Sequence, residues 1–196
     1  MESPTARVLL MQLVNNTIII FFEGENFQGL RLEASGEVES FLERRFPGCV
    51  GSARVESGAW LCFEHAHLQG QQLVLEHGEY AHLRSWGDRC EEMGSCRPVH
   101  MFGENFSIEL FEGADLTGQC VELNEDCPLL VQVPTWGRRA VASIRVRGDG
   151  AWVLYDDSNY RGRQYLLERG VYRCPAAWKA SSGTVLSLRR VNNYLS

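Results

Sequence analysis

Lysine is almost absent from this sequence. Of its 19 basic residues, 18 are arginine and only Lys179 is lysine. With 25 acidic residues the formal net charge is −6, which argues against nucleic acid as a partner and discourages association at high concentration. Guanidinium is planar, delocalised and weakly hydrated, so the bias favours a polarisable, densely packed protein. A GC-rich coding sequence would produce the same bias, and this alternative stays open.

Long hydrophobic runs and helical periodicity are missing too. The apolar run at residues 8–14 is too short and interrupted for a membrane span, and no signal-peptide cleavage site is evident. We therefore expect no membrane association, a cytoplasmic location and a flexible arm over residues 1–16. The seven cysteines are odd in number and follow no repeating framework, so we expect reduced thiols.

Catalytic signatures are absent as well. The chain has no Gly-x-Ser-x-Gly elbow, no glycine-rich phosphate loop and no His-Glu-x-x-His helix. Ser95 lies beside Cys96 and close to Glu91, but serines recur at equivalent positions elsewhere in the chain, which favours a structural role. We expect no enzymatic activity and no cofactor.

The sequence does contain one pattern four times. An aromatic residue is followed five positions later by an aromatic residue or leucine, then two positions later by glycine, and a serine closes the copy. The copies are Phe22, Phe27, Gly29 and Ser52; Phe63, Leu68, Gly70 and Ser95; Phe111, Leu116, Gly118 and Ser143; and Tyr155, Tyr160, Gly162 and Ser187. The glycines recur at steps of 41, 48 and 44 residues, which indicates that one supersecondary unit has been copied.

The copies alternate in type. The first and third begin with Phe-Glu-Gly, whereas the second and fourth begin with Gly-Ala-Trp and run in step at an offset of 92 residues. The order is therefore ABAB. It predicts two domains, residues 17–99 and 106–194, joined by a linker at residues 100–105.

The local pattern within each copy is that of short β-strands. Segments 17–22, 71–76, 107–112 and 164–168 alternate polar with apolar residues or are rich in β-formers, and turn residues bound them. We expect each glycine where a hairpin folds over, in a conformation that a Cβ would oppose. We expect each late serine to hydrogen-bond backbone groups of that hairpin. The prediction is an all-β chain whose two domains are each a sandwich of two Greek-key motifs.

This fourfold pattern resembles the βγ-crystallin superfamily, in particular the vertebrate lens gamma branch and its gamma-N group. The stretches 94–98, 111–113, 159–165 and 187–191 carry the likeness, which covers residues 18–193. Leu68 and Leu116 depart from the aromatic residue usual at their positions, which should loosen those hairpin corners. The resemblance implies a structural constituent of the eye lens, a stable and highly soluble refractive protein of the fibre-cell cytosol. The alternative is a non-lens binding or stress protein of the same superfamily with weak metal binding.

The resemblance also assigns structural roles to individual residues. It implies buried tryptophans at Trp60, Trp86, Trp152 and Trp178, and tyrosine corners at Tyr80 and Tyr172. It implies a patch that packs one domain on the other, made of Leu61, Val74, Val99, Val153, Leu166 and Val191 and flanked by Gln72, Gln164, Arg97 and Arg189. We expect a monomer with intramolecular domain pairing and weak short-range interactions with other crystallins; exchange of domains between chains is the alternative.

Two kinds of metal site come into question for this sequence. Microbial relatives hold calcium with paired Asn or Asp residues five and four positions before the late serine. Here those pairs are at 47–48, 90–91, 138–139 and 182–183, and none supplies two adjacent amide or carboxylate oxygens. Cys62, His65 and His67 lie close together in the second copy, where the histidines would share a face of an extended segment. Adventitious capture of zinc or copper is one interpretation, and unconnected surface imidazoles are the other.

Overall fold

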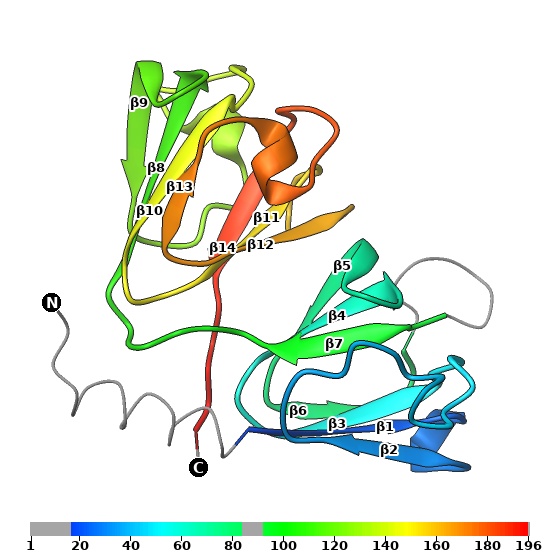
Figure 1. Cartoon of the computed structure of the whole chain (residues 1–196). Coiled ribbons are helices and arrows are strands. Elements are labelled where there is room, and N and C mark those ends of the chain that lie inside the picture. Colours follow the sequence, from blue (N-terminus) through cyan, green and yellow to red (C-terminus); the bar gives the residue numbers. More distant parts are fainter. Residues whose placement is uncertain (1–16, 84–91, 196) are drawn as a thin grey trace, which may run out of the picture. The chain divides into compact units, whose positions relative to one another are not determined.

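The computed structural model describes residues 17–83 and 92–195. The chain divides into two compact units, shown in Figure 1. Unit 1 contains the residues up to Val99 together with those from Asn192 onward, and unit 2 is His100–Val191. No helix in these two described stretches is long and apolar enough to span a lipid bilayer.

Unit 1 is built from two antiparallel sheets. Its strands are β1 (Ile18–Phe22), β2 (Arg31–Ala34), β3 (Ser52–Ser57), β4 (Trp60–His65), β5 (Gln69–Leu75), β6 (Gly78–Tyr80) and β7 (Ser95–Pro98). A short 3₁₀ turn, η1 (Glu25–Phe27), follows β1. One sheet has the order β2-β1-β3-β6, and in the other β4 pairs with both β5 and β7.

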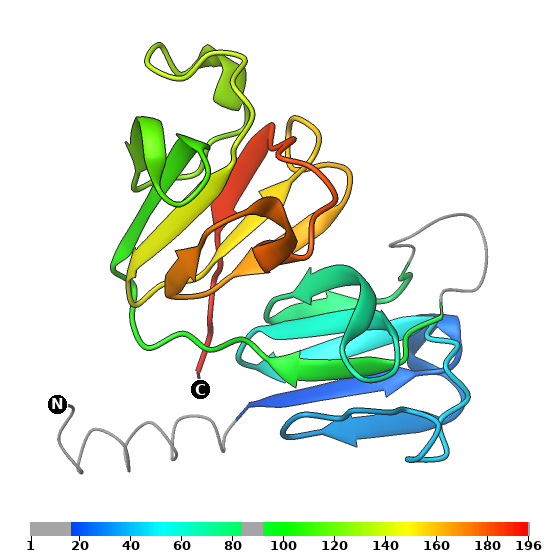
Figure 2. The same ribbon diagram turned by 45° about the horizontal axis from the view of Figure 1, so that its top comes forward.

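Unit 2 repeats this plan. Its strands are β8 (Phe106–Gly113), β9 (Thr117–Leu123), β10 (Ser143–Gly148), β11 (Trp152–Tyr155), β12 (Gln164–Leu167), β13 (Gly170–Tyr172) and β14 (Ser187–Arg190), with 3₁₀ turns η2 (Leu130–Gln132) and η3 (Pro175–Trp178). One sheet runs β13-β10-β8-β9, and in the other β11 pairs with β12 and β14. The two sheets of the unit are seen from a second direction in Figure 2.

In each unit, a segment of each copy pairs with the sheet of the other copy. In unit 1, β6 of the second copy pairs with β3 of the first, while Val38 of the first bridges to Cys96 on β7 of the second. Unit 2 does the same, with β13 paired to β10 and Cys127 bridged to Leu188. This crossing is the Greek-key connection. The predicted all-β fold of paired Greek-key sandwiches is confirmed.

Alternation along the strands places the core between the sheets of each unit. In unit 1, Ile19 and Phe21 on β1 and Trp60 and Cys62 on β4 are completely buried in one apolar cluster. A second cluster fills unit 2, with Ile108 and Leu110 on β8 and Trp152 and Leu154 on β11. Residues two apart on a strand share a face, so the period-2 pattern of the sequence becomes two cores.

Residues after β14 return to unit 1. The backbone N–H of Asn192 donates to Oε2 of Glu76 at 2.6 Å, the N–H of Gly58 donates to the carbonyl of Tyr194, and the Tyr194 ring lies 4.4 Å from that of His77. The segment after β7 makes the equivalent contact in unit 2, where the backbone N–H of His100 donates to Oε2 of Glu168 at 2.5 Å. Both donors and both acceptors differ by 92 positions, so the two segments are equivalent.

Candidate functional site: the four hairpin corners

The four late serines occupy the same setting in every copy. The hydroxyl of Ser52 accepts the N–H of Phe27 at 2.9 Å and donates to the carbonyl of Gly24 at 2.6 Å. The equivalent pairs are Leu68 N–H and His65 carbonyl for Ser95, Leu116 N–H and Gly113 carbonyl for Ser143, and Tyr160 N–H and Asp157 carbonyl for Ser187. All four serines have no exposed surface. A hydroxyl can donate and accept at once, so one buried side chain satisfies two backbone groups.

The backbone that each serine holds is left-handed. Phe27, Leu68, Leu116 and Tyr160 have φ between 57° and 60°, and the glycines two positions later have φ between 78° and 88°. A non-glycine residue in this region costs roughly 1–2 kcal/mol. The two hydrogen bonds of the buried serine offset that cost and keep the hairpin folded over.

A repeated carboxylate at these corners was not predicted. Glu23, Glu64, Glu112 and Asp156 directly follow the first aromatic residue of their copies. Each accepts the backbone N–H of the residue after the corner glycine: Leu30 at 3.4 Å, Gln71 at 3.1 Å, Gln119 at 3.0 Å and Arg163 at 2.8 Å. The signal was available in the sequence, because an acidic residue stands at this position in all four copies.

The carboxylate gives the corner glycine a second reason to lack a side chain. A Cβ built on Gly118 would lie 2.6 Å from Cγ of Glu112, and one on Gly162 would lie 2.0 Å from Oδ1 of Asp156. These glycines therefore provide both the left-handed backbone and the space through which the carboxylate reaches the chain.

The pKa of Glu112 lies below its ordinary value. The hydrogen bond from the Gln119 N–H lowers the pKa of Glu112 most, and the Arg139 guanidinium, whose Nε lies 3.0 Å from Oε2, lowers it further. Arg139 also belongs to the pair 138–139, one of the four candidate positions for calcium. The positively charged guanidinium of Arg139 therefore lies at this corner of the third copy. The pair 90–91 lies outside the described residues.

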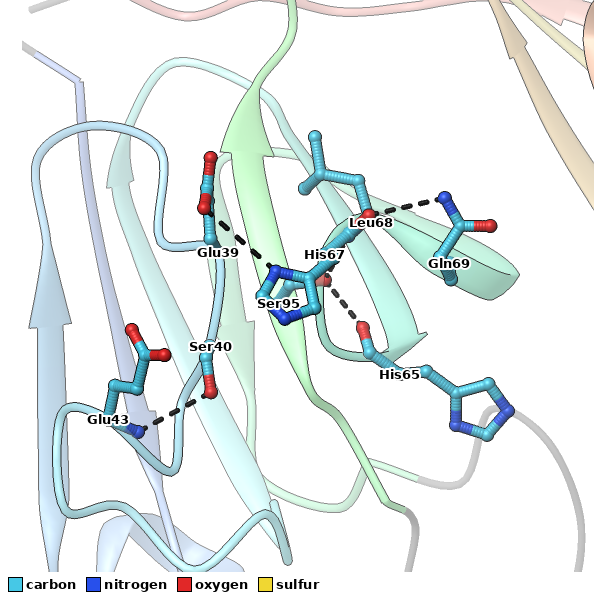
Figure 3. A network of polar contacts seen from close by, with 8 residues as sticks. All are labelled: Glu39, Ser40, Glu43, His65, His67, Leu68, Gln69 and Ser95. Atoms are coloured by element: carbon cyan, nitrogen blue, oxygen red, sulfur yellow. Dashed lines mark hydrogen bonds and ion pairs between the residues drawn. The ribbon is translucent and has the colours of Figure 1, made fainter.

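The structure does not bring Cys62, His65 and His67 together. Cys62 is buried in the core of unit 1, whereas both histidines are exposed. Figure 3 shows the two imidazole rings pointing in different directions, that of His67 toward Glu39. His67 has a φ of 60°, so the segment turns at this residue and the histidines do not share a face. Among residues 17–83 and 92–195, no group of three or more His, Cys, Asp or Glu side chains could hold a metal ion.

The tyrosines and tryptophans lie as follows. The Tyr80 hydroxyl donates to the Glu76 carbonyl at 2.9 Å and accepts the Glu76 N–H at 3.0 Å, and Tyr172 makes the same pair with Glu168, both at 3.0 Å.

Trp60, Trp152 and Trp178 are buried, and Trp86 lies outside the described residues. A further tryptophan, Trp136, is fully buried in the core of unit 2 and was not among those expected.

Three of the five expected docking residues of each unit form one cross-strand row. On β4, Leu61 stands opposite Val74 of β5 and Arg97 of β7. In unit 2 the same row consists of Val153, Leu166 and Arg189. The six apolar residues, Leu61, Val74, Val99, Val153, Leu166 and Val191, are all at most 8% exposed. Gln72 stands opposite Phe63 on the β5 side of the row, and Gln164 stands opposite Tyr155 on β12.

The expectation of seven reduced thiols is wrong, because the chain contains a disulfide. Cys90 lies outside the described residues. Cys49 is disulfide-bonded. Cys62, Cys96, Cys120, Cys127 and Cys174 are free, and of these Cys120 and Cys174 are exposed. A disulfide that is not repeated leaves no periodic cysteine pattern, which is why the sequence pattern did not reveal it.

Two stacked antiparallel sheets per unit, with a serine-held corner in every copy, define a double Greek-key protein of the crystallin type. The Beta/Gamma crystallin family model matches residues 18–99 and 107–191, and the chain belongs to this family. It is 52% identical over 176 residues to Gamma-crystallin N of Mus musculus, covering 90% of this chain and 96% of that one. It is 49% identical over the same length to Gamma-crystallin N of Xenopus tropicalis, with the same coverage, and 48% identical over 133 residues to that of Homo sapiens, covering 68% and 72%.

Removing one corner hydroxyl is expected to destabilise the chain. Ser143→Ala leaves the partly buried N–H of Leu116 and the carbonyl of Gly113 without their shared partner, so the free energy of unfolding measured in urea should fall by about 1–3 kcal/mol. The control is Ser107→Ala, whose exposed hydroxyl bonds Glu122 at 2.8 Å and whose loss should cost less than about 0.5 kcal/mol. Equal losses for the two variants would contradict the structural role of the corner.

Glu112 predicts a dependence on acid. Because its pKa is lower in the folded state, its contribution to stability is complete above its unfolded-state pKa and is lost as pH falls through the folded-state value. The difference in free energy of unfolding between the wild type and Glu112→Gln should therefore shrink below about pH 4. Urea titrations across a pH series measure this difference, and a gap that stays constant would refute the assignment.

Proposed function

We propose that this protein is a structural constituent of the eye lens, a refractive protein of the fibre-cell cytoplasm that maintains transparency. The observation that carries the proposal is the use of the recurring polar residues. Every corner serine and every corner carboxylate bonds backbone groups of its own hairpin. The repeated chemistry of the chain thus serves the fold, and the similarity to gamma-crystallins supports the same conclusion.

The arginines support a refractive role. The Arg54 guanidinium lies 4.6 Å from the centroid of the Phe27 ring, and that of Arg145 lies 5.8 Å from that of Phe111. Stacking of this kind suits guanidinium better than ammonium, because guanidinium is planar and weakly hydrated. It holds polarisable groups together at the surface. The net charge of −6 opposes attraction between copies, so contacts with other crystallins would be weak and short-ranged.

The apolar rows support a monomer with intramolecular pairing of its domains. Each unit carries a row of the same composition, Leu61 and Val74 in one and Val153 and Leu166 in the other. Two like surfaces on one chain pack together in preference to those of separate chains, because a short connection raises their effective concentration. Residues 100–105 provide that connection.

High concentration should leave the protein in clear solution. Static light scattering with rising concentration is expected to show net repulsion and no turbidity. The control is the variant Glu33→Gln, Glu79→Gln, Glu122→Gln, which replaces three exposed carboxylates and changes the net charge from −6 to −3, and which should scatter more. Turbidity of the wild type at moderate concentration would favour a binding or stress protein over a lens constituent.

Charge introduced into the row should uncouple the domains. Val74→Asp or Leu166→Asp is expected to convert one thermal transition into two, because an unpaired carboxylate opposes burial of the row. Val171→Asp places the same charge at an exposed position on β13 and should leave one transition. Differential scanning calorimetry distinguishes these outcomes, and a single sharp transition for Val74→Asp would refute the docking role.

A further inference from the structure

Two buried cysteines of unit 1 stand directly opposite each other. Cys62 on β4 and Cys96 on β7 are cross-strand partners, and neither has exposed surface. The equivalent positions of unit 2, 92 residues later, hold Leu154 and Leu188, which are also paired and fully buried. Packing alone is therefore satisfied by two leucines, whereas unit 1 places a thiol at both positions of the pair.

Cys62 and Cys96 form a non-hydrogen-bonded pair, the type in which the two opposite Cα atoms lie closest together. The N–H and carbonyl of Cys96 both bond Val38 on the far side, at 3.0 and 2.9 Å, so they do not bond β4. Pro98, two positions further along β7, has no N–H to donate to β4. The two pair types alternate along a strand, so Cys96 and Pro98 are of the same, non-hydrogen-bonded type. Opposite residues of a non-hydrogen-bonded pair have Cα atoms about 4.5 Å apart. Disulfides span Cα separations of about 4.4–6.8 Å, so the backbone already has a suitable spacing.

We propose that Cys62 and Cys96 form a latent disulfide site that hydrogen peroxide oxidises. The thiolate of one cysteine attacks the peroxide oxygen, an S–O bond forms, the O–O bond breaks and water leaves after proton transfer, which gives a sulfenic acid. The second thiolate then attacks that sulfur, an S–S bond forms, the S–O bond breaks, and the hydroxide takes up a proton and leaves as a second water. The two thiols lose two electrons together, and hydrogen peroxide is reduced to two molecules of water.

Burial makes the site slow to react while the protein is folded. It raises the pKa of Cys96 to about 12, and burial together with the neighbouring Cys96 raises the pKa of Cys62. Because the thiolate is the reactive form, the pair reacts more slowly than an exposed thiol. The site therefore stays reduced under mild conditions and forms the disulfide on prolonged exposure to oxidant, joining the adjacent strands β4 and β7 on the core side of their sheet.

The test is peptide mapping of the full chain after incubation with hydrogen peroxide under native conditions. The unreduced digest is expected to contain a peptide that joins Cys62 to Cys96, with the loss of two hydrogen atoms from the summed mass of the pair. The joined peptide should appear after oxidation of Cys120 and Cys174 and disappear on treatment with a reductant. Its absence while those exposed cysteines are oxidised, or the joining of Cys62 or Cys96 to any other cysteine, would overturn the proposal.

A second measurement separates a cross-link from other oxidation. The urea midpoint of unit 1, followed by hydrogen exchange of β4 and β7, should rise after peroxide treatment, because a cross-link restricts the unfolded chain. Cys62→Ala should abolish that rise, whereas Cys127→Ala, which removes a buried free thiol of unit 2, should retain it. A midpoint that rises equally in Cys62→Ala would also refute the site. The wild-type map remains decisive if Cys62→Ala fails to fold.

Discussion

A single hydrogen-bonding group, the buried serine hydroxyl, makes this architecture possible. Each corner bends the chain through left-handed residues, which is costly, and leaves an N–H and a carbonyl turned away from the sheets. One hydroxyl satisfies both, at 2.6 to 3.0 Å, in all four copies. Because the corner closes the first hairpin of its copy over the sandwich, the apolar faces beneath it are covered. The core and the strand exchange between copies both depend on that closure.

The corner carboxylates extend the same logic. The glycine that permits the left-handed backbone also leaves room for an acidic side chain to reach the next N–H, so one absence of a Cβ serves two purposes. Polar residues that recur four times are fully engaged in this way. The remaining distinctive features of the chain are its use of arginine in place of lysine and its excess of negative charge. The proposed lens role depends on such bulk physical properties, namely charge, polarisability and persistence of the fold.

The fold could be predicted because its determinants repeat, and four spaced copies of aromatic, glycine and serine specify strands, corners and pairing. Features that do not belong to this repeated pattern could not be predicted from it. Trp136 was overlooked because its counterpart in unit 1, Phe46, is not a tryptophan, although both lie in the cores six or seven residues before the closing serine. The separation of His65 from His67 follows from the left-handed backbone at residue 67, which spacing alone does not show. The disulfide at Cys49 likewise depends on three-dimensional proximity.

The return of residues 192–195 to unit 1 makes that unit discontinuous along the chain. Its set of contacts includes the backbone pairing of Gly58 with Tyr194 and the bond from Asn192 to Glu76, and neither exists until all of unit 2 has been synthesised. During translation the first domain to emerge is thus the last to be completed. Its maturation is timed by the ribosome's progress through its neighbour.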